Sequence, residues 1–291
     1  NNILTNGNFG IISFGDRNFI LQNTISGFKN YGMDVRGATI VISNNILDAQ
    51  HMNSNEHGVG MVVHGNSDFI ISENTITNSA NGISSYGQDG VIKNNIISNN
   101  DEVGLRISWG SDDTVVIDNL ISNNGVGLYI GNNGNTAYHN NLISNTQEGT
   151  GGSSYLVNLF QSNDLGGNYW SDYSPNCSDN NHDNFCDDSY PLKDIVSLND
   201  DLIWTVQDGW LTSINTPSNS IVDAVDSSGL SHNYSVSATH DGTSMSVSCD
   251  YTSGSTFPIG VTDVLCTANN GIHATFSVTV NPPPPAISST S

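Results

Sequence analysis

The stretch VIKNNIISNNDEVGLRI, residues 91–107, contains the pattern that decides the fold. Its three short apolar runs, around Ile92, Ile97 and Leu105, are separated by polar turn residues. Asn95 opens the tetrad Asn-x-(Ile/Leu)-(Ser/Thr/Asp), whose Asn recurs at Asn2, Asn23, Asn45, Asn74, Asn95, Asn119 and Asn141. The steps between successive copies are 21, 22, 29, 21, 24 and 22 residues. Self-similarity at a period of this length indicates a repeat protein.

Each period predicts three short strands separated by turns. A second register agrees, because a glycine recurs at Gly10, Gly32, Gly60, Gly82, Gly104 and Gly127. A propeller blade needs about 40 residues, and helical leucine-rich repeats need helix formers that are scarce here. One coil of a parallel β-helix fits, with coils stacked at about 4.8 Å. We expect the recurring Asn to form an internal ladder, each amide bonded to its copy one coil away, and to adopt the left-handed bend that Asn tolerates.

The repeat resembles that of right-handed β-helix proteins with copper-protein-maturation-like and carbohydrate-binding or hydrolase repeats. The resemblance covers about residues 1–170. It implies an all-β chain in which residues 1–167 form a right-handed parallel β-helix of about seven coils. It implies little about activity, because such repeats occur in lyases, epimerases, adhesins and surface proteins alike.

Charge and composition exclude several classes of function. The 291 residues include 6 Lys+Arg and 28 Asp+Glu, a net charge of −22, which argues against binding to nucleic acid or to an anionic membrane surface. No run of 18 apolar residues is present, so we expect no membrane insertion. The 42 Asn and 29 Gly favour turns and ladders over helices. The chain opens on Asn1 without a signal peptide, so we expect a processed or trimmed chain.

The pattern changes after the repeat, where residues 167–173 read GNYWSDY. An acidic loop and Tyr190-Pro191-Leu192 follow. This order resembles the ending of archaeal surface β-helix proteins. We therefore expect residues 168–215 to form an acidic, disulfide-bracketed cap or connector.

The acidic loop has the oxygen spacing of an EF-hand-type calcium loop. Its donors at positions 1, 3, 5, 7 and 9 would be Asp179, Asn181, Asp183, the carbonyl of Phe185, and Asp187. Position 6 is Asn184 instead of Gly, and position 12 is Tyr190 instead of Glu. The sequence therefore predicts a calcium site, with a solvated acidic turn as the alternative.

The four cysteines form two local pairs, Cys177 with Cys186 and Cys249 with Cys266. Three connectivities are possible, and pairing by proximity is the simplest. The spacing does not match a zinc ribbon. Disulfides indicate an oxidising compartment, so we expect an extracellular or cell-surface protein. Glycosylation sequons begin at Asn176 and Asn233.

The last third of the chain has a different composition, since Asn falls from 36 in the first 200 residues to 6 in the last 91. Alternating apolar residues, as in 274–280, predict an antiparallel sandwich. The block SGSTFPIG, residues 253–260 between two cysteines, resembles the hyalin-repeat (HYR) family. That resemblance implies an immunoglobulin-like adhesion module over residues 216–281, and residues 282–291 form a Pro-rich tail.

These features predict a structural or adhesive surface protein without catalytic activity, as a subunit of a filament or surface layer. The first coil has no polar cap ahead of it, so we expect a homo-oligomer or filament in which a neighbour covers the open strand edge.

Two alternatives remain open. A polysaccharide lyase, hydrolase or epimerase would use Asp112 and Asp113 with Arg106, or Asp34 with Arg36. A glycan-binding module would stack sugars on Tyr31, Tyr86, Trp109 and Tyr129. The long coil after Asn45 gathers His51, Glu56, His57 and His64, either as a metal or sugar site or as a polar surface loop.

Overall fold

The computed structural model describes residues 1–284, except 51–57, 66, 109, 132–133, 153–158, 160–164 and 193–198. In these residues the chain is all-β apart from two single-turn 3-10 helices, η1 (Ser174–Asn176) and η2 (Gly209–Leu211). It divides into two compact units, one of residues 1–178 and 185–207, the other of residues 179–184 and 208–291. Within the described ranges, no helix has the length and apolar character needed to cross a bilayer.

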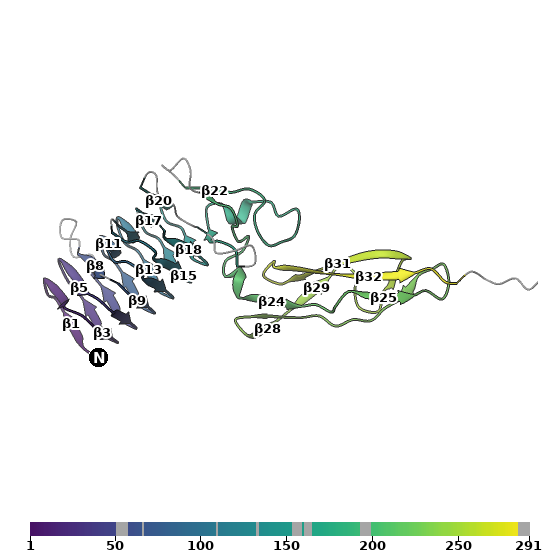
Figure 1. Ribbon diagram of the computed structural model, residues 1–291, viewed down its shortest axis with the longest axis horizontal. Coiled ribbons are helices and arrows are strands. Elements are labelled where there is room, and N and C mark those ends of the chain that lie inside the picture. The colour runs from purple at the N-terminus through teal and green to yellow at the C-terminus, as the bar shows by residue number, and fades with distance from the viewer. Residues whose placement is uncertain are drawn as a thin grey trace, which may run out of the picture. The chain divides into compact units, whose positions relative to one another are not determined.

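The first unit is a parallel β-solenoid built from three sheets that run along it (Figure 1). Sheet A contains β1 (Ile3–Thr5), β4 (Thr24–Ser26), β7 (Ile46–Asp48), β10 (Thr75–Thr77), β13 (Ile96–Ser98), β16 (Leu120–Ser122), β19 (Asn141–Ile143) and β21 (Tyr169–Trp170). Sheet B contains β2 (Phe9–Phe14), β5 (Tyr31–Gly37), β8 (Val59–Gly65), β11 (Asn81–Ser85), β14 (Val103–Ile107), β17 (Val126–Ile130) and β20 (Gln147–Gly151). Sheet C contains β3 (Asn18–Leu21), β6 (Ile40–Ser43), β9 (Phe69–Ser72), β12 (Val91–Lys93), β15 (Val115–Ile117) and β18 (Thr136–Tyr138).

The predicted parallel β-helix is thus confirmed as a parallel solenoid, with about six turns where the repeat count predicted about seven. Only six turns in the described residues have a strand in sheet C, because β18 is the last strand of that sheet. The core consists of columns of apolar side chains that stack in register from turn to turn. In sheet A the column is Ile25, Leu47, Ile76, Ile97, Ile121 and Leu142, all buried. Each fully buried side chain of this size contributes roughly 1.5–3 kcal/mol.

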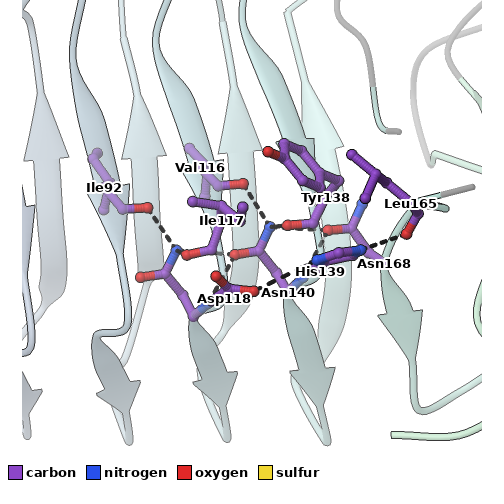
Figure 2. Close-up of polar contacts among 10 residues, drawn as sticks. Ile92, Val116, Ile117, Asp118, Tyr138, His139, Asn140, Leu165 and Asn168 are labelled. Carbon is purple, nitrogen blue, oxygen red and sulfur yellow. Dashed lines mark hydrogen bonds and ion pairs between the residues drawn. The ribbon is translucent and has the colours of Figure 1, made fainter. Parts of the chain in front are cut away.

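An asparagine ladder lines the turn that leads into sheet A (Figure 2). The backbone N–H and the side-chain Nδ2 of Asn95 both donate to Oδ1 of Asn119, at 3.0 and 2.9 Å. The same Nδ2 donates to the carbonyls of Lys93 and Ile71, each at 3.0 Å. The pattern repeats at buried side chains of Asn23, Asn45, Asn74, Asn95, Asn119, Asn140 and Asn168.

Two details of the predicted ladder are wrong. In its seventh coil the ladder residue is Asn140 and not Asn141, since Leu142 is the residue in register with Ile121. The left-handed bend belongs to the residue before each ladder Asn from Asn23 to Asn140, for example Asn94 with φ 54° and Asp118 with φ 56°. Because the ladder Asn is extended, its backbone N–H can point along the solenoid axis together with its side-chain amide.

The bonds from one ladder Asn to the next are all donated toward the C-terminal side, so the last Asn needs an acceptor that is not another Asn. Asp200 supplies it, because its Oδ2 accepts from the backbone N and Nδ2 of Asn168 at 2.9 and 3.0 Å and from Trp170 Nε1 at 3.0 Å. A second ladder, not predicted, runs through Asn100, Asn124 and Asn145. It ends in the same way, on the buried carboxylate of Glu148.

Short strands complete the chain. In the first unit β22 (Tyr190–Pro191) pairs with β23 (Asn199–Asp200). The second unit has sheets of three, four and two strands. They are β24 (Thr212–Asn215), β27 (Ser237–His240) and β28 (Thr243–Met245); β25 (Ser220–Asp223), β32 (His273–Asn281), β31 (Gly260–Ala268) and β29 (Val247–Cys249); and β26 (Leu230–Ser231) with β30 (Thr256–Phe257).

The predicted period-2 alternation is present in the second unit, where alternate residues of β31 and β32 are buried. Its core is formed by Phe257, Val264, Cys266, Phe276 and Val278. The sheet with β31 and β32 is mixed, because β25 pairs with β32 in parallel while β31 pairs with it in antiparallel fashion. The immunoglobulin-like arrangement remains a prediction.

The ladder end predicts a measurable pH dependence. Burial raises the pKa of Asp200 from 3.8 to about 6, against four N–H donors that favour its charged form. Since the native pKa lies above the unfolded one, the free energy of unfolding that Asp200 contributes is highest below about pH 4 and falls by roughly 3 kcal/mol as the pH rises to about 6. Denaturant unfolding at pH 4, 5, 6 and 7 should show this loss in the wild-type protein relative to Asp200→Asn.

The matched control is the variant Asp68→Asn, which removes one exposed carboxylate from the solenoid. Its pH profile should run parallel to that of the wild-type protein. Identical profiles for wild-type protein and Asp200→Asn would contradict the role of Asp200.

Candidate functional site

The outer face of sheet B gathers polar, aromatic and cationic side chains. Successive side chains of a strand point to opposite faces, so each sheet B strand sends alternate residues to the core and to the surface. One row on the outer face is in register across five strands and consists of Asp34, Val62, Ser84, Arg106 and Tyr129, of which the first three are buried and the last two half-buried. Arg36 and His64 are in register in the next row, and Tyr86 directly follows β11.

Ring contacts order these side chains. The rings of His64 and Tyr86 stack with centroids 4.8 Å apart and 12° between planes. The guanidinium carbon of Arg106 lies 4.7 Å from the centroid of the Tyr129 ring, a cation–π contact. Tyr86 is 39% exposed, so one aromatic surface remains open to solvent. A hollow of about 380 Å³ is lined by Tyr31, Val59, Val62, His64, Asn81, Ser84, Tyr86 and Arg106.

An ion pair lies at one edge of this face. Arg36 donates from Nε and Nη2 to the two carboxylate oxygens of Asp34, at 3.0 and 2.9 Å. The hydrogen bond with Asp34 raises the pKa of Arg36. Burial, with the charge of Arg36 as the next cause, lowers the pKa of His64, so this imidazole is neutral at pH 7. Both oxygens of the buried Asp34 are engaged, which leaves it poorly suited to act as a general base.

The other predicted catalytic set, Arg106 with Asp112 and Asp113, is not brought together in the structure. Arg106 lies over Tyr129, toward β17, whereas Asp112 and Asp113 lie in the turn between β14 and β15 that leads to sheet C. The backbone carbonyl of Asp112 accepts from Asp89 N at 3.1 Å, and Asp113 has a left-handed φ of 55°. These contacts assign the two aspartates to the turn rather than to the sheet B face.

The predicted aromatic set is divided. Tyr31 and Tyr129 lie on the outer face of sheet B, and Tyr86 joins them through its stack on His64. Trp109 and the loop residues His51, Glu56 and His57 lie outside the described residues. The stacking of His64 on Tyr86 was not predicted, although the two residues are one regular step of 22 apart, each four residues after a repeat glycine.

The acidic loop is closed by its own backbone. Asp179 accepts from the N–H groups of Asp183 and Asn184, each at 3.1 Å, and Asn181 Oδ1 also accepts from Asp183 N, at 3.1 Å. Asn184 has a φ of 75°, the left-handed conformation predicted for position 6. Phe185 packs its buried ring on Trp204 at 4.7 Å.

Asp187, the last predicted calcium ligand, donates its N–H to the Ser178 carbonyl at 2.8 Å. Among the described residues, no group of three or more His, Cys, Asp or Glu is placed to hold a metal ion. The predicted calcium loop therefore does not appear as a cluster of carboxylates.

The cysteine prediction is confirmed, because the structure contains the disulfides Cys177–Cys186 and Cys249–Cys266. The second joins directly paired residues of β29 and β31. The sequon residues Asn176 and Asn233 are both exposed. Their glycosylation remains a prediction.

Comparison with known proteins gives one result. Residues 1–175 match the family described as periplasmic copper-binding protein (NosD). No curated protein and no solved structure matches the chain. The match covers more than half of the chain and includes the strands of the solenoid up to β21.

The family description raises the question of copper. Copper sites use thiolate, thioether and imidazole ligands, but all four cysteines are in disulfides. His64 is stacked on Tyr86, and no three-residue metal group occurs in the described part of the chain. The described residues therefore do not fit a copper site. The predicted location outside the cytoplasm is confirmed by the periplasmic family, and the chain belongs to the NosD family of parallel β-solenoid proteins.

Proposed function

We propose that this protein is a non-catalytic, adhesive β-helix protein of the periplasm or cell surface, and that the outer face of sheet B binds glycans. The observation that carries this proposal is the hollow of about 380 Å³ beside Tyr86, whose exposed ring is fixed by stacking on His64. Sugars bind proteins through aromatic surfaces that pack on their C–H faces, together with a few oriented polar groups. Asn81 and Ser84 supply polar groups in the same hollow.

The ion pair of Asp34 and Arg36 supports binding rather than cleavage. Glycoside cleavage needs two carboxyl groups on either side of the bond, one of which acts as an acid. Asp34 faces this side of the sheet, and both of its oxygens accept from Arg36. We therefore favour adhesion over a lyase, hydrolase or epimerase activity.

The second unit supports an adhesive role. We propose that residues 216–281 are a hyalin-repeat-like module with immunoglobulin-like strand packing. The block of residues 253–260, the disulfide Cys249–Cys266 and the alternating burial of β31 and β32 support this proposal.

The glycan proposal makes a direct prediction for Tyr86→Ala. Removal of the exposed ring should lower glycan affinity about fivefold or more, if stacking of a sugar contributes as much as the roughly 1–3 kcal/mol of a nucleic-acid base stacked on an aromatic ring. The measurement is a glycan array followed by calorimetry on the ligands that give a signal. Tyr138→Ala, which removes a half-buried tyrosine from the outer face of sheet C, should leave the affinity unchanged.

Both variants should keep the melting temperature within a few degrees, since surface substitutions usually change stability by less than about 0.5 kcal/mol. Binding that survives Tyr86→Ala, or the absence of any glycan signal, would count against the proposal. Release of reducing sugar from a bound glycan would argue for an enzyme instead.

Calcium binding by the acidic loop also remains our proposal. The alternating oxygens of Asp179, Asn181 and Asp183 and the left-handed Asn184 support it. We expect calcium to raise the melting temperature relative to chelator, because an ion would neutralise these carboxylates. The rise should be absent in Asp183→Ala and retained in the exposed Asp201→Ala, and no response to calcium in the wild-type protein would refute the proposal.

We further propose that the protein self-associates into a homo-oligomer or filament. Large apolar side chains on the first turn support this, with Ile3, Phe14 and Phe19 exposed by 79%, 67% and 63%. Contiguous exposed apolar surface commonly marks an interaction site. Sedimentation and negative-stain images should show assemblies that the double variant Phe14→Ser, Phe19→Ser loses and the control Val225→Ser retains. A wild-type protein that is monomeric at high concentration would disprove self-association.

A further inference from the structure

We infer that the sheet B face selects acidic glycans, with Arg106 binding the carboxylate of a uronic acid residue. This inference rests on the proposed glycan binding and adds the chemical class of the ligand. The ligand would be an extended polyuronate segment that crosses the strands of sheet B, with one sugar ring on Tyr86 and a neighbouring carboxylate at Arg106.

The placement of positive charge is the first observation. The chain has only 6 Lys+Arg against 28 Asp+Glu, and two of the six, Arg36 and Arg106, lie on the outer face of this one sheet. They are on β5 and β14, which are separated by three inter-strand spacings, or about 14 Å. Because Asp34 pairs with Arg36, the cation on this face that is placed to meet an anionic ligand is Arg106.

The two arginines differ in what they already bind. Arg36 is neutralised by Asp34, so it contributes orientation rather than free charge. Arg106 packs its guanidinium plane on the ring of Tyr129. Stacking fixes this plane and leaves its edge to donate, and a planar guanidinium fork matches a carboxylate with two parallel hydrogen bonds.

The polar groups around Arg106 suit a uronic acid residue whose carboxylate lies at the guanidinium of Arg106. Ser84 is in register with Arg106 on the neighbouring strand and offers a hydroxyl. Asn81 donates from Nδ2 to Glu102 Oε2 at 2.9 Å, which holds its amide at the rim of the hollow. Glu102 and Asp34 are the carboxylates that flank this face, and each already accepts a hydrogen bond from a protein group.

The net charge of −22 sets a condition on binding. Repulsion between exposed charges is screened beyond about 8 Å at physiological ionic strength. A polyuronate can therefore contact Arg106 at ordinary salt concentrations, whereas a polymer as densely charged as a nucleic acid needs many phosphate-binding cations that this chain lacks.

The test compares polygalacturonate with its methyl ester, two ligands that share a backbone and differ in charge. Affinity electrophoresis at 0.15 M salt should show at least about tenfold tighter binding of the acid form by the wild-type protein. Arg106→Gln should remove that preference and leave binding of the ester unchanged. Arg17→Gln, the same charge change at an exposed turn between β2 and β3, should retain it.

Arg106→Lys keeps the charge without the planar fork and should retain part of the preference, which provides a second variant if Arg106→Gln is poorly folded. Equal binding of acid and ester, or a preference that survives Arg106→Gln, would overturn the acidic-glycan inference while leaving glycan binding intact. Failure to bind either polymer or any neutral glycan would overturn both proposals.

Discussion

The asparagine ladder is the interaction on which the solenoid depends. A buried amide group that lacks partners costs free energy comparable to a lost hydrogen bond or more. Here the Nδ2 of each ladder residue from Asn45 to Asn140 donates to the next Asn and to two backbone carbonyls, as Asn119 does to Asn140, Ile117 and Ile92. The ladder therefore fixes the register of neighbouring turns. Because the register is fixed, the apolar side chains of the three sheets stack in columns. The surface rows of sheet B, and the candidate glycan site with them, follow from that register.

Much of this fold could be predicted from the sequence, because period, strand alternation and ladder residues are local signals. The errors arose where local signals are ambiguous. Asn141 fits the tetrad fully, whereas Asn140 has Ile143 at the fourth position, and only the register of the apolar column identifies Asn140 as the ladder residue. The role of Asp200 could not be predicted, since it is 32 residues from the Asn168 that it accepts from. Glu148 is only three residues from Asn145, but its role depends on the second ladder, which was not predicted.

The candidate site was predictable in part. Alternation places Tyr129 and Arg106 on the same face as soon as sheet B is recognised. The pairing of Asp34 with Arg36 follows from their spacing of two in one strand, which brings both side chains to the same face. The stack of His64 on Tyr86 follows from the same repeat, because each residue lies four after a repeat glycine, Gly60 or Gly82. The long coil before β8 does not alter this register. The seven extra residues there leave the ladder intact, because Asn45 still bonds to Asn74 at 2.9 Å.

The direction of donation between successive ladder side chains gives the solenoid a mechanical polarity. Removing a turn from the C-terminal side leaves two N–H donors of each ladder Asn, its backbone N and its Nδ2, without their shared acceptor. Removing a turn from the N-terminal side leaves one Nδ2 donor without its carbonyl and frees an acceptor oxygen, which buried sites tolerate more readily than an unpaired N–H. At the C-terminal ends of the two ladders, the carboxylates of Asp200 and Glu148 accept these last donors, so that no ladder N–H is left unpaired there. Under force or heat, such a rod is expected to fray from its N-terminal turns and to hold its C-terminal turns until last.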